Sequence, residues 1–589
     1  MPTHHDHANL IWQIADLLRG PYRPPQYERV MLPMTVLRRF DSVLAPTKAK
    51  VLAEYNKRKG GKLTDDALDR FLNRASGQRF HNHSPLDFQK LKDDPDNIEK
   101  HLVSYIKGFS ANVRTIFDFF EFEAEIEKLR EAGILYLVVS KFCDVDLHPT
   151  VVKNEEMGLI FENLIRRFNE LANETAGDHF TPREVIRLMV NLLFINDDAL
   201  LAVPGTVRKL LDPACGTGGM LAESQNYLRE HHSAAQLYTY GQDYNKRAFA
   251  TAASDMLMKE VAHNGGGDNV RYGDIFTDDQ FPRETFDYLL ANPPFGVDWK
   301  KQAREIENEH QKQGHAGRFE AGLPRVNDGS LLFLQHMVSK FEPVLPDQHQ
   351  HGSRLAIVFS GSPLFTGGAG SGESEIRRWI IEKDWLEAVI ALPEQMFYNT
   401  GIGTYIWIVT NRKEKRRKGK IQLLDARECF IPMRRSLGDK RRKIGEGRDG
   451  EPDQIADIVR LYGRFAGGER SKTFANADFG YRRVTIERPQ RDEQGKIVPD
   501  KHGQPAPDAR LRDCENIPLT EDVDAYFARE VLPHVPDAWM DRAKDKVGYE
   551  INFNRHFYRY TPPRDLEAID ADLKASEEEF MRLLKEVTA

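Results

Sequence analysis

Short apolar runs alternate with helix-like segments between Gly177 and about Ala426, and this alternation constrains the fold most. It is typical of a doubly wound, mostly parallel α/β sheet of the Rossmann-like kind, whose strands are buried on both faces. The last two predicted strands are joined by only Asn411–Gly419, too short for a crossover helix, so we expect them to pair as an antiparallel hairpin. The predicted strands lie near residues 208–212, 237–242, 269–273, 286–291, 354–360, 386–392, 404–410 and 420–425.

The two flanks of this central part differ from it. Residues 1–150 carry apolar side chains at helical spacing, for example Phe122, Ile126 and Leu129, which predicts an N-terminal all-α domain. Residues 431–589 are highly charged, contain Gly-, Asp- and Pro-rich connectors and end in a helix-like stretch, so we expect a charged, partly helical region suited to docking a partner subunit. The expected domains are 1–150, 151–430 and 431–589.

Composition excludes several classes of protein. No run of about eighteen apolar residues exists and the first residues are polar, so the sequence predicts neither a membrane span nor a secretory signal, and we expect a cytoplasmic protein without a membrane partner. The four cysteines lie far apart without Cys-x-x-Cys spacing, which argues against a disulfide framework and against a zinc site. We expect no metal.

Charge bears on nucleic-acid binding. The net charge is −7, whereas a protein that holds a duplex unaided usually has an excess of Lys and Arg, so this chain alone is expected to read DNA poorly. One local exception runs from Arg412 to Lys443, where fourteen Lys and Arg accompany four acids. Such a run forms either a solvated hairpin or a binding surface.

A glycine-rich loop follows the strand predicted at 208–212. The loop begins at Asp212 and is followed by a predicted helix, an arrangement that can hold a nucleotide-like cofactor. Glycines let the backbone approach a ligand closely. Cys215, inside the loop, is interpreted as a small residue in a tight turn rather than as a nucleophile. The candidate cofactor residues here are Asp212, Gly216, Thr217, Gly218 and Gly219.

Two acids follow the next two predicted strands. Asp243 can accept both ribose hydroxyls of such a cofactor, or it can cap the helix predicted at Lys246–Lys259. Asp274 can accept an adenine amino group, or it is an ordinary loop acid. Upstream, Thr181 is expected to cap a helix with Pro182 at its first position, so that this turn closes over the cofactor.

The segment Asn292-Pro-Pro-Phe295 follows the strand predicted at 286–291. Its prolines fix the backbone and remove two N–H donors, which leaves an array of acceptors suited to a planar amino group, although the same residues can simply form a turn. Asn292 and the Pro293 carbonyl would accept the amine hydrogens, Pro294 would stiffen the turn, and Phe295 would stack on a base taken out of a duplex. Because both motifs follow strands of one parallel sheet, we expect them to open into one crevice.

The order of these motifs resembles that of S-adenosylmethionine-dependent amino-group DNA methyltransferases, and specifically the modification (M) subunit of type I restriction-modification systems. The resemblance covers nearly the whole chain and includes the stretch from Phe479 to Arg488. It implies a class I methyltransferase sheet and a cofactor site for S-adenosylmethionine. The upstream residues that it assigns to this site are Asp178, His179, Phe180, Thr181, Pro182 and Arg183.

The resemblance also implies partners. A separate specificity (S) subunit would read the DNA, a second copy of the M subunit would join it, and a restriction (R) subunit can join to cleave unmodified DNA. The expected reaction is direct methyl transfer to adenine N6 without a covalent intermediate. We also expect residues 296–328, a long polar loop, to order over the substrate.

Three alternatives stay open at this stage. The chain could be a stand-alone adenine methyltransferase that reads DNA with residues 431–589. It could methylate protein glutamine or RNA, because an Asn-Pro-Pro-aromatic turn suits any planar amine. It could also be a scaffold whose site no longer acts.

Overall fold

The computed structural model describes residues 14–61, 63–172, 181–232, 234–259, 269–345, 347, 350–448, 450–558 and 565–588. The chain forms two compact units, Met1–Ile551 and Asn552–Ala589. Three of the residues expected to hold the cofactor, Asp178, His179 and Phe180, lie outside the described residues.

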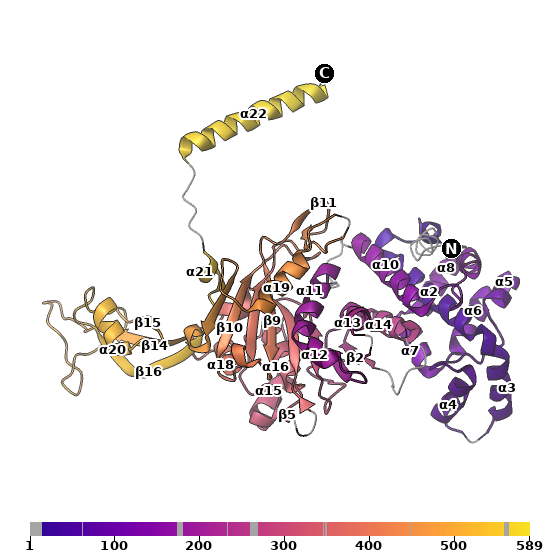
Figure 1. The fold of residues 1–589 in the computed structure, drawn as a ribbon, viewed down its shortest axis with the longest axis horizontal. Helices are drawn as coiled ribbons and strands as arrows, with labels where there is room; N and C mark the ends of the chain where they lie inside the picture. The colour runs from indigo at the N-terminus through magenta and orange to yellow at the C-terminus, as the bar shows by residue number, and fades with distance from the viewer. Residues whose placement is uncertain are drawn as a thin grey trace. The chain divides into compact units, whose positions relative to one another are not determined.

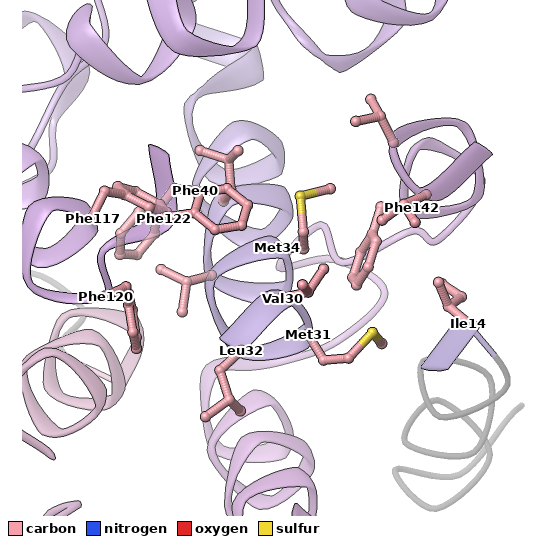
Figure 2. Close-up of a cluster of buried hydrophobic side chains, with 14 of the residues drawn as sticks. Ile14, Val30, Met31, Leu32, Met34, Phe40, Phe117, Phe120, Phe122 and Phe142 are labelled. Atoms are coloured by element: carbon pink, nitrogen blue, oxygen red, sulfur yellow. The ribbon is translucent and has the colours of Figure 1, made fainter. Parts of the chain in front are cut away.

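The N-terminal part is helical, as the sequence predicts, and is built around α2 (Glu28–Leu44). This helix is buried on nearly every side, which is typical of the central helix of a bundle. Figure 2 shows Phe117, Phe120 and Phe122 to one side of α2, and Ile14 and Phe142 to the other. The other helices of this part are α3 (Lys48–Arg58), α4 (Asp65–Ser76), α5 (Phe88–Asp93), α6 (Ile98–Lys107), α7 (Ala111–Phe119), α8 (Phe122–Glu131), α9 (Leu135–Cys143) and α10 (Asn154–Ala172).

A nine-stranded sheet forms the centre of the first unit (Figure 1). Its strand order is β13-β10-β8-β9-β7-β4-β1-β2-β3, and only β9 and β13 run antiparallel to their neighbours. The mostly parallel α/β fold is therefore confirmed. The strands are β1 (Val207–Asp212), β2 (Gln236–Asp243), β3 (Val270–Tyr272), β4 (Tyr288–Ala291), β7 (Arg354–Ser360), β8 (Leu386–Ala391), β9 (Thr404–Thr410), β10 (Lys420–Asp425) and β13 (Ser471–Ala475).

The predicted hairpin between residues 404–410 and 420–425 is wrong. β9 lies between β7 and β8, and β10 pairs in parallel with the far side of β8. The link Asn411–Gly419 passes the start of β8, where the Asp384 carboxylate accepts hydrogen bonds from Lys413 Nζ (2.6 Å) and from the Gly419 N–H (2.9 Å). Nine residues easily span the roughly 10 Å between next-nearest strands, so a short link does not guarantee adjacent pairing.

Helices α11, α13, α14 and α19 share one hydrophobic core with alternate residues of the strands. All residues of β7, β8 and β9 are buried, which explains why the interiors of these strands are apolar apart from Glu387 in β8. Helix α16 packs against β7. The helices of this part are α11 (Arg183–Phe194), α12 (Asp198–Leu201), α13 (Gly219–His231), α14 (Lys246–Lys259), α15 (Ala303–Gln313), α16 (Ser330–Ser339), α17 (Ser362–Phe365), α18 (Gly372–Glu382) and α19 (Gln454–Arg464).

Beyond residue 430 the chain is richer in strands than the sequence predicted. A two-stranded ribbon, β11 (Ile431–Leu437) and β12 (Lys440–Lys443), follows β10. A second sheet, in the order β15-β14-β16, encloses a small core with Val484, Ile486 and Ile517. Charged residues of both signs interrupt the apolar pattern of these strands, so the sequence analysis did not predict them. This sheet comprises β14 (Gly480–Glu487), β15 (Asp513–Pro518) and β16 (Trp539–Tyr549), next to the short helix α20 (Val523–Tyr526).

The second unit contains α21 (Phe553–Phe557) and the long helix α22 (Leu566–Thr588), which the sequence predicted near residues 566–587. Apolar residues recur along α22 at helical spacing and are exposed, including Leu566, Leu573 and Phe580 at 76%, 62% and 63%. Within the described residues, no helix is both long enough and apolar enough to cross a membrane.

Candidate active site

The sequence motifs meet at one edge of the sheet. The glycine loop follows β1, Asp243 ends β2, Asp274 follows β3 and Asn292 follows β4. These strands are neighbours in the order β4-β1-β2-β3 and are parallel, so their carboxyl ends open into the same crevice. The expected common crevice is therefore present.

The glycine loop owes its path to two residues with left-handed backbones. Gly216 has φ 52° and Gly218 has φ 84°, a region that side chains with a Cβ rarely adopt. Gly218 is the N-cap of α13 and lies against Ala252 of α14, where a Cβ would come within 3.3 Å of the alanine Cβ. The absence of a side chain at Gly218 therefore lets the loop pack closely against α14.

Asp243 holds the glycine loop in place. One carboxylate oxygen accepts the Gly216 N–H at 2.8 Å, and the other accepts the Asn245 N–H at 2.8 Å. The cap of α14 is Asn245, whose side-chain oxygen accepts the N–H groups of Arg247 (3.0 Å) and Ala248 (3.1 Å). The alternative interpretation of Asp243 as that cap is wrong, and the sequence analysis missed Asn245.

Asp212, at the end of β1, is buried with 2% of its surface exposed and accepts the Ala214 N–H at 3.1 Å. Burial, together with the nearby Asp243 carboxylate, raises the pKa of Asp212 to about 8. Burial also raises the pKa of the Cys215 thiol well above its usual value. A protonated, enclosed thiol is a poor nucleophile, which agrees with Cys215 as a small packing residue.

Asn292 and Thr181 meet across the crevice. The Asn292 amide N–H donates to the Thr181 hydroxyl at 2.9 Å, and only 8% of the Asn292 surface is exposed. The Asn292 side-chain oxygen is buried and has no hydrogen-bond partner among the described residues. Thr181 is not a helix cap as expected, because α11 begins at Arg183 with Pro182 as its N-cap.

Of the other three residues of the Asn-Pro-Pro-Phe turn, only Pro294 lines the cavity described below. Pro293 is not among the lining residues. The Phe295 ring meets Phe397 edge to face at 5.7 Å and packs against the main core. It does not line this cavity. The role predicted for Phe295, stacking on the target base, stays a prediction.

The segment 296–328 is not an irregular loop. It contains α15, and Trp299, Ile306 and Phe319 are buried in a small core of their own. From this segment the Gln302 amide donates to the Asp274 carboxylate at 2.6 Å, while the other oxygen of Asp274 accepts the Phe276 N–H at 2.9 Å. The polar surface of α15 had suggested a loop, although its apolar residues anchor it.

A cavity of about 580 Å³ joins these groups. Among the predicted residues, it is lined by Thr181, Asp212, Gly216, Thr217, Gly219, Asp243, Asp274, Asn292 and Pro294. Pro182, Arg183 and Gly218 are not among its lining residues. Five acids and three cations of the described residues line the cavity, and the carboxyl groups suit a ligand that carries hydroxyl or amino groups: Glu28, Asp212, Asp243, Asp274 and Asp298, with Arg29, Arg247 and Lys301.

The N-terminal helices supply part of the wall. Glu28, Arg29 and Leu32 of α2, Phe120 and Ile165 line the same cavity. The turn before α8 is held against the sheet by Phe119, whose ring meets Tyr272 at 4.8 Å, and by an ion pair between Glu121 and Arg247 at 3.0 Å. The sequence analysis did not single out these residues, because they belong to ordinary helical patterns.

The basic segment 412–443 is partly internal. Arg412 pairs with Asp197 at 2.5 Å, Lys413 pairs with Asp384, and the buried Lys440 pairs with Glu184 of α11. The segment as a whole is therefore neither a solvated hairpin nor a binding surface, because several of its cations pair with acids inside the fold.

The comparisons with known proteins agree with this site. The family model described as N-6 DNA Methylase matches residues 152–472, more than half of the chain. The chain belongs to the N-6 DNA methylase family. A second family model, the HsdM N-terminal domain, matches residues 7–142 of this methylase, the region of the predicted all-α domain.

Relatives of this methylase are named as methylase subunits of type I restriction enzymes. The Type I restriction enzyme MjaIX methylase subunit of Methanocaldococcus jannaschii is 23% identical over 452 residues, 73% of this chain and 75% of the relative. The MjaVII methylase subunit of the same organism is 32% identical over 250 residues, 42% of this chain and 39% of the relative. The resemblance inferred from the motif order is confirmed.

A solved structure shares the fold of this methylase. The type I restriction-modification system methyltransferase subunit from Streptococcus thermophilus superposes with a TM-score of 0.60 at 19% identity. The match covers 81% of this chain and 97% of that subunit.

Proposed function

We propose that this methylase transfers a methyl group from S-adenosylmethionine to N6 of an adenine in duplex DNA, as the methylating subunit of a type I restriction-modification complex. One observation carries the proposal. The buried Asn292 oxygen has no partner among the described residues, and Asn292 shares a cavity with the glycine loop. A buried acceptor without a donor costs free energy unless a ligand supplies the donor.

The acceptor explains how the chain activates its substrate. The lone pair of an adenine amino group is delocalised into the ring, so the group is a poor nucleophile. The Asn292 oxygen accepts one amine hydrogen and the Pro293 carbonyl accepts the other, which draws the nitrogen toward a tetrahedral geometry. Thr181 keeps the Asn292 amide in the orientation that presents its oxygen. Holding the two reactants in this geometry supplies most of the rate gain.

The residues of the cavity fit the proposed cofactor. S-adenosylmethionine, when bound, supplies an electrophilic methyl group on a positively charged sulfur. Asp243 and Asp274 lie beside the glycine loop, where carboxylate oxygens accept hydrogen bonds from ribose hydroxyls and from an adenine amino group. Asp212, whose pKa is raised to about 8, lines the same part of the cavity. We assign Asp178, His179, Phe180, Pro182, Arg183, Thr217, Gly218 and Gly219 to the same cofactor site on the motif pattern.

The enclosed acceptor also defines how DNA must bind. A base inside a duplex cannot reach a side chain that is 8% exposed, so the adenine has to swing out of the helix into the cavity. Pro294 lines the cavity that receives the base. We assign Phe295 to stacking on the base on the motif pattern.

The division of labour follows from charge and from the C-terminal helix. With a net charge of −7, this chain depends on a separate specificity subunit to read the sequence. The exposed apolar stripe of α22 is suited to packing against helices of that subunit. A second copy of this chain completes the methylating complex, and a restriction subunit can join it.

Labelled methyl transfer tests the proposal. The chain, assembled with its specificity subunit, is given methyl-tritiated S-adenosylmethionine with duplex DNA, RNA or protein, and the product is identified by mass spectrometry. Label in N6-methyladenine of the duplex is the expected result. Label in protein glutamine, in RNA or in cytosine would refute the proposal, and methylation of one DNA sequence by the chain alone would favour a stand-alone enzyme.

A further inference from the structure

Apart from Arg442, whose guanidinium lies 4.0 Å from the centre of the Phe430 ring, the cations of the basic segment 412–443 fall into three groups. About half of them pair with acids of the chain, as Arg412, Lys413 and Lys440 do. Three exposed lysines, Lys415, Lys418 and Lys420, lie in or directly after the link that passes the start of β8, at the amino edge of the sheet. The third group, the ribbon arginines, comprises Arg434, Arg435 and Arg441.

The ribbon arginines are exposed and form no ion pair with any other described residue. They come together because the ladder of β11 and β12 is irregular. Pro432 pairs with Arg442 and Leu437 pairs with Lys440, so that four residues of β11, including both arginines, lie opposite Arg441 alone. Like charges across a ladder are unfavourable, so a concentration of three in one bulge indicates an anionic partner.

The turn end of the ribbon is attached to two segments that lead to the active site. On one side, Lys440 donates to the Glu184 carboxylate, in the first turn of the helix that follows Thr181. On the other side, the N–H groups of Arg441 and Arg442 donate to the Gln395 carbonyl at 3.0 and 3.2 Å. Gln395 lies two residues before Phe397, the ring that meets Phe295. The ribbon arginines are therefore positioned relative to the Asn-Pro-Pro-Phe turn.

We propose that the β11–β12 ribbon binds the phosphate backbone of the DNA beside the adenine that enters the active site. This inference rests on the proposed function. A guanidinium group pairs with phosphate through two parallel hydrogen bonds, and phosphate contacts position a duplex without reading its sequence. A chain that leaves base reading to a partner still has to hold the strand from which it extracts a base.

The salt dependence of DNA binding measures how many phosphates the ribbon arginines contact. Each phosphate neutralised by a cation contributes about 0.9 to the slope of log KD against log salt concentration. The test uses the full chain assembled with its specificity subunit and a duplex that carries the target. In the ribbon variant all three ribbon arginines are changed to Ala. We expect a slope smaller by about 2 to 3 and a KD raised about tenfold or more at moderate salt.

A matched control removes the same charge from the same segment. Changing Lys415, Lys418 and Lys420 to Ala takes three exposed, unpaired cations from the opposite edge of the sheet. This control variant should keep the wild-type slope and affinity. Both variants should bind S-adenosylmethionine like the wild type, because none of the six side chains lines the cavity.

The outcomes separate the two claims. A ribbon variant with the slope of the wild type, in a complex that methylates adenine, would overturn the ribbon's role and leave the function standing. A ribbon variant that no longer assembles with the specificity subunit would also overturn it, because the ribbon would then be a protein interface. A wild-type complex that does not methylate DNA would refute the function itself.

Discussion

Thr181 and Asn292 lie 111 residues apart in the sequence and are joined by a hydrogen bond of 2.9 Å in which the Asn292 amide donates to the Thr181 hydroxyl. The bond decides which atom of the amide is available. With the nitrogen engaged, the buried oxygen is the atom left to accept from a substrate. Thr181 is thus a positioning residue for Asn292, a role that differs from the cofactor contact implied by the motif.

Thr181→Val should lower kcat about tenfold, because it keeps the shape of the side chain but removes the hydroxyl that orients Asn292. The dissociation constant for S-adenosylmethionine should change by less than about twofold, and Thr181→Ser should restore the rate. Steady-state methylation and equilibrium cofactor binding measure the two effects. A variant that loses cofactor affinity while keeping kcat would assign Thr181 to the cofactor instead.

Asp212 should make the protein without cofactor less stable as the pH rises. Its folded pKa, about 8, lies above the ordinary value near 4, so the folded state keeps a proton that the unfolded state loses. This contribution to stability is fully present below pH 4 and is lost as the pH rises through about 8. The melting temperature of the wild type should therefore fall between pH 5 and pH 9.

Asp212→Asn provides the control for this titration, because the amide has the same shape and carries no proton to lose. The melting curves of wild type and Asp212→Asn should diverge as the pH rises, with the wild type falling more steeply. Parallel pH profiles of the two proteins would show that Asp212 does not titrate in this range.

Phe120→Leu should weaken S-adenosylmethionine binding several-fold, because Phe120 brings the N-terminal helices into the wall of the cavity. Loss of part of a buried aromatic contact is worth about 1 kcal/mol. Phe122→Leu is the matched control, since Phe122 lies in the same core but does not line the cavity. Equal cofactor affinity in the two variants would place Phe120 outside the binding site.

Replacing Leu573 and Phe580 with Glu should abolish co-purification with the specificity subunit and leave cofactor binding unchanged. Both side chains belong to the exposed apolar stripe of α22, and a buried charge opposes packing between helices. Glu at Ala571 and Ala575, on the opposite face of α22, adds the same charge away from the stripe and should be tolerated. Assembly that survives the stripe variant would locate the docking surface elsewhere.

Local sequence patterns were enough to predict the strands. All eight predicted strands are present, and their bounds differ by at most two residues from the observed ones. The reason is burial on both faces, which leaves a nearly continuous apolar run in β7, β8 and β9, interrupted inside a strand by Glu387. The motif residues that follow β1 and β4 were found for a related reason, since glycine and proline at strand ends have few structural substitutes.

Relations between distant residues could not be predicted in this way. β10 pairs with β8, and the link that precedes β10 contacts Asp384 at the start of β8. Phe120 reaches the cavity only because the N-terminal helices pack on α14. The pair of Lys440 with Glu184 spans 256 residues. Each of these follows from tertiary packing, which leaves no periodic signal in the sequence.

Methyl transfer by Asn292→Ala tests the central claim most directly. The change removes the buried acceptor and keeps the glycine loop, so methylation of adenine by the assembled complex should be nearly abolished while S-adenosylmethionine binding stays within about twofold of the wild type. Asn308→Ala, an exposed asparagine of α15, should be fully active. Wild-type methylation by Asn292→Ala would contradict the account, because the amino group would then be held by other residues.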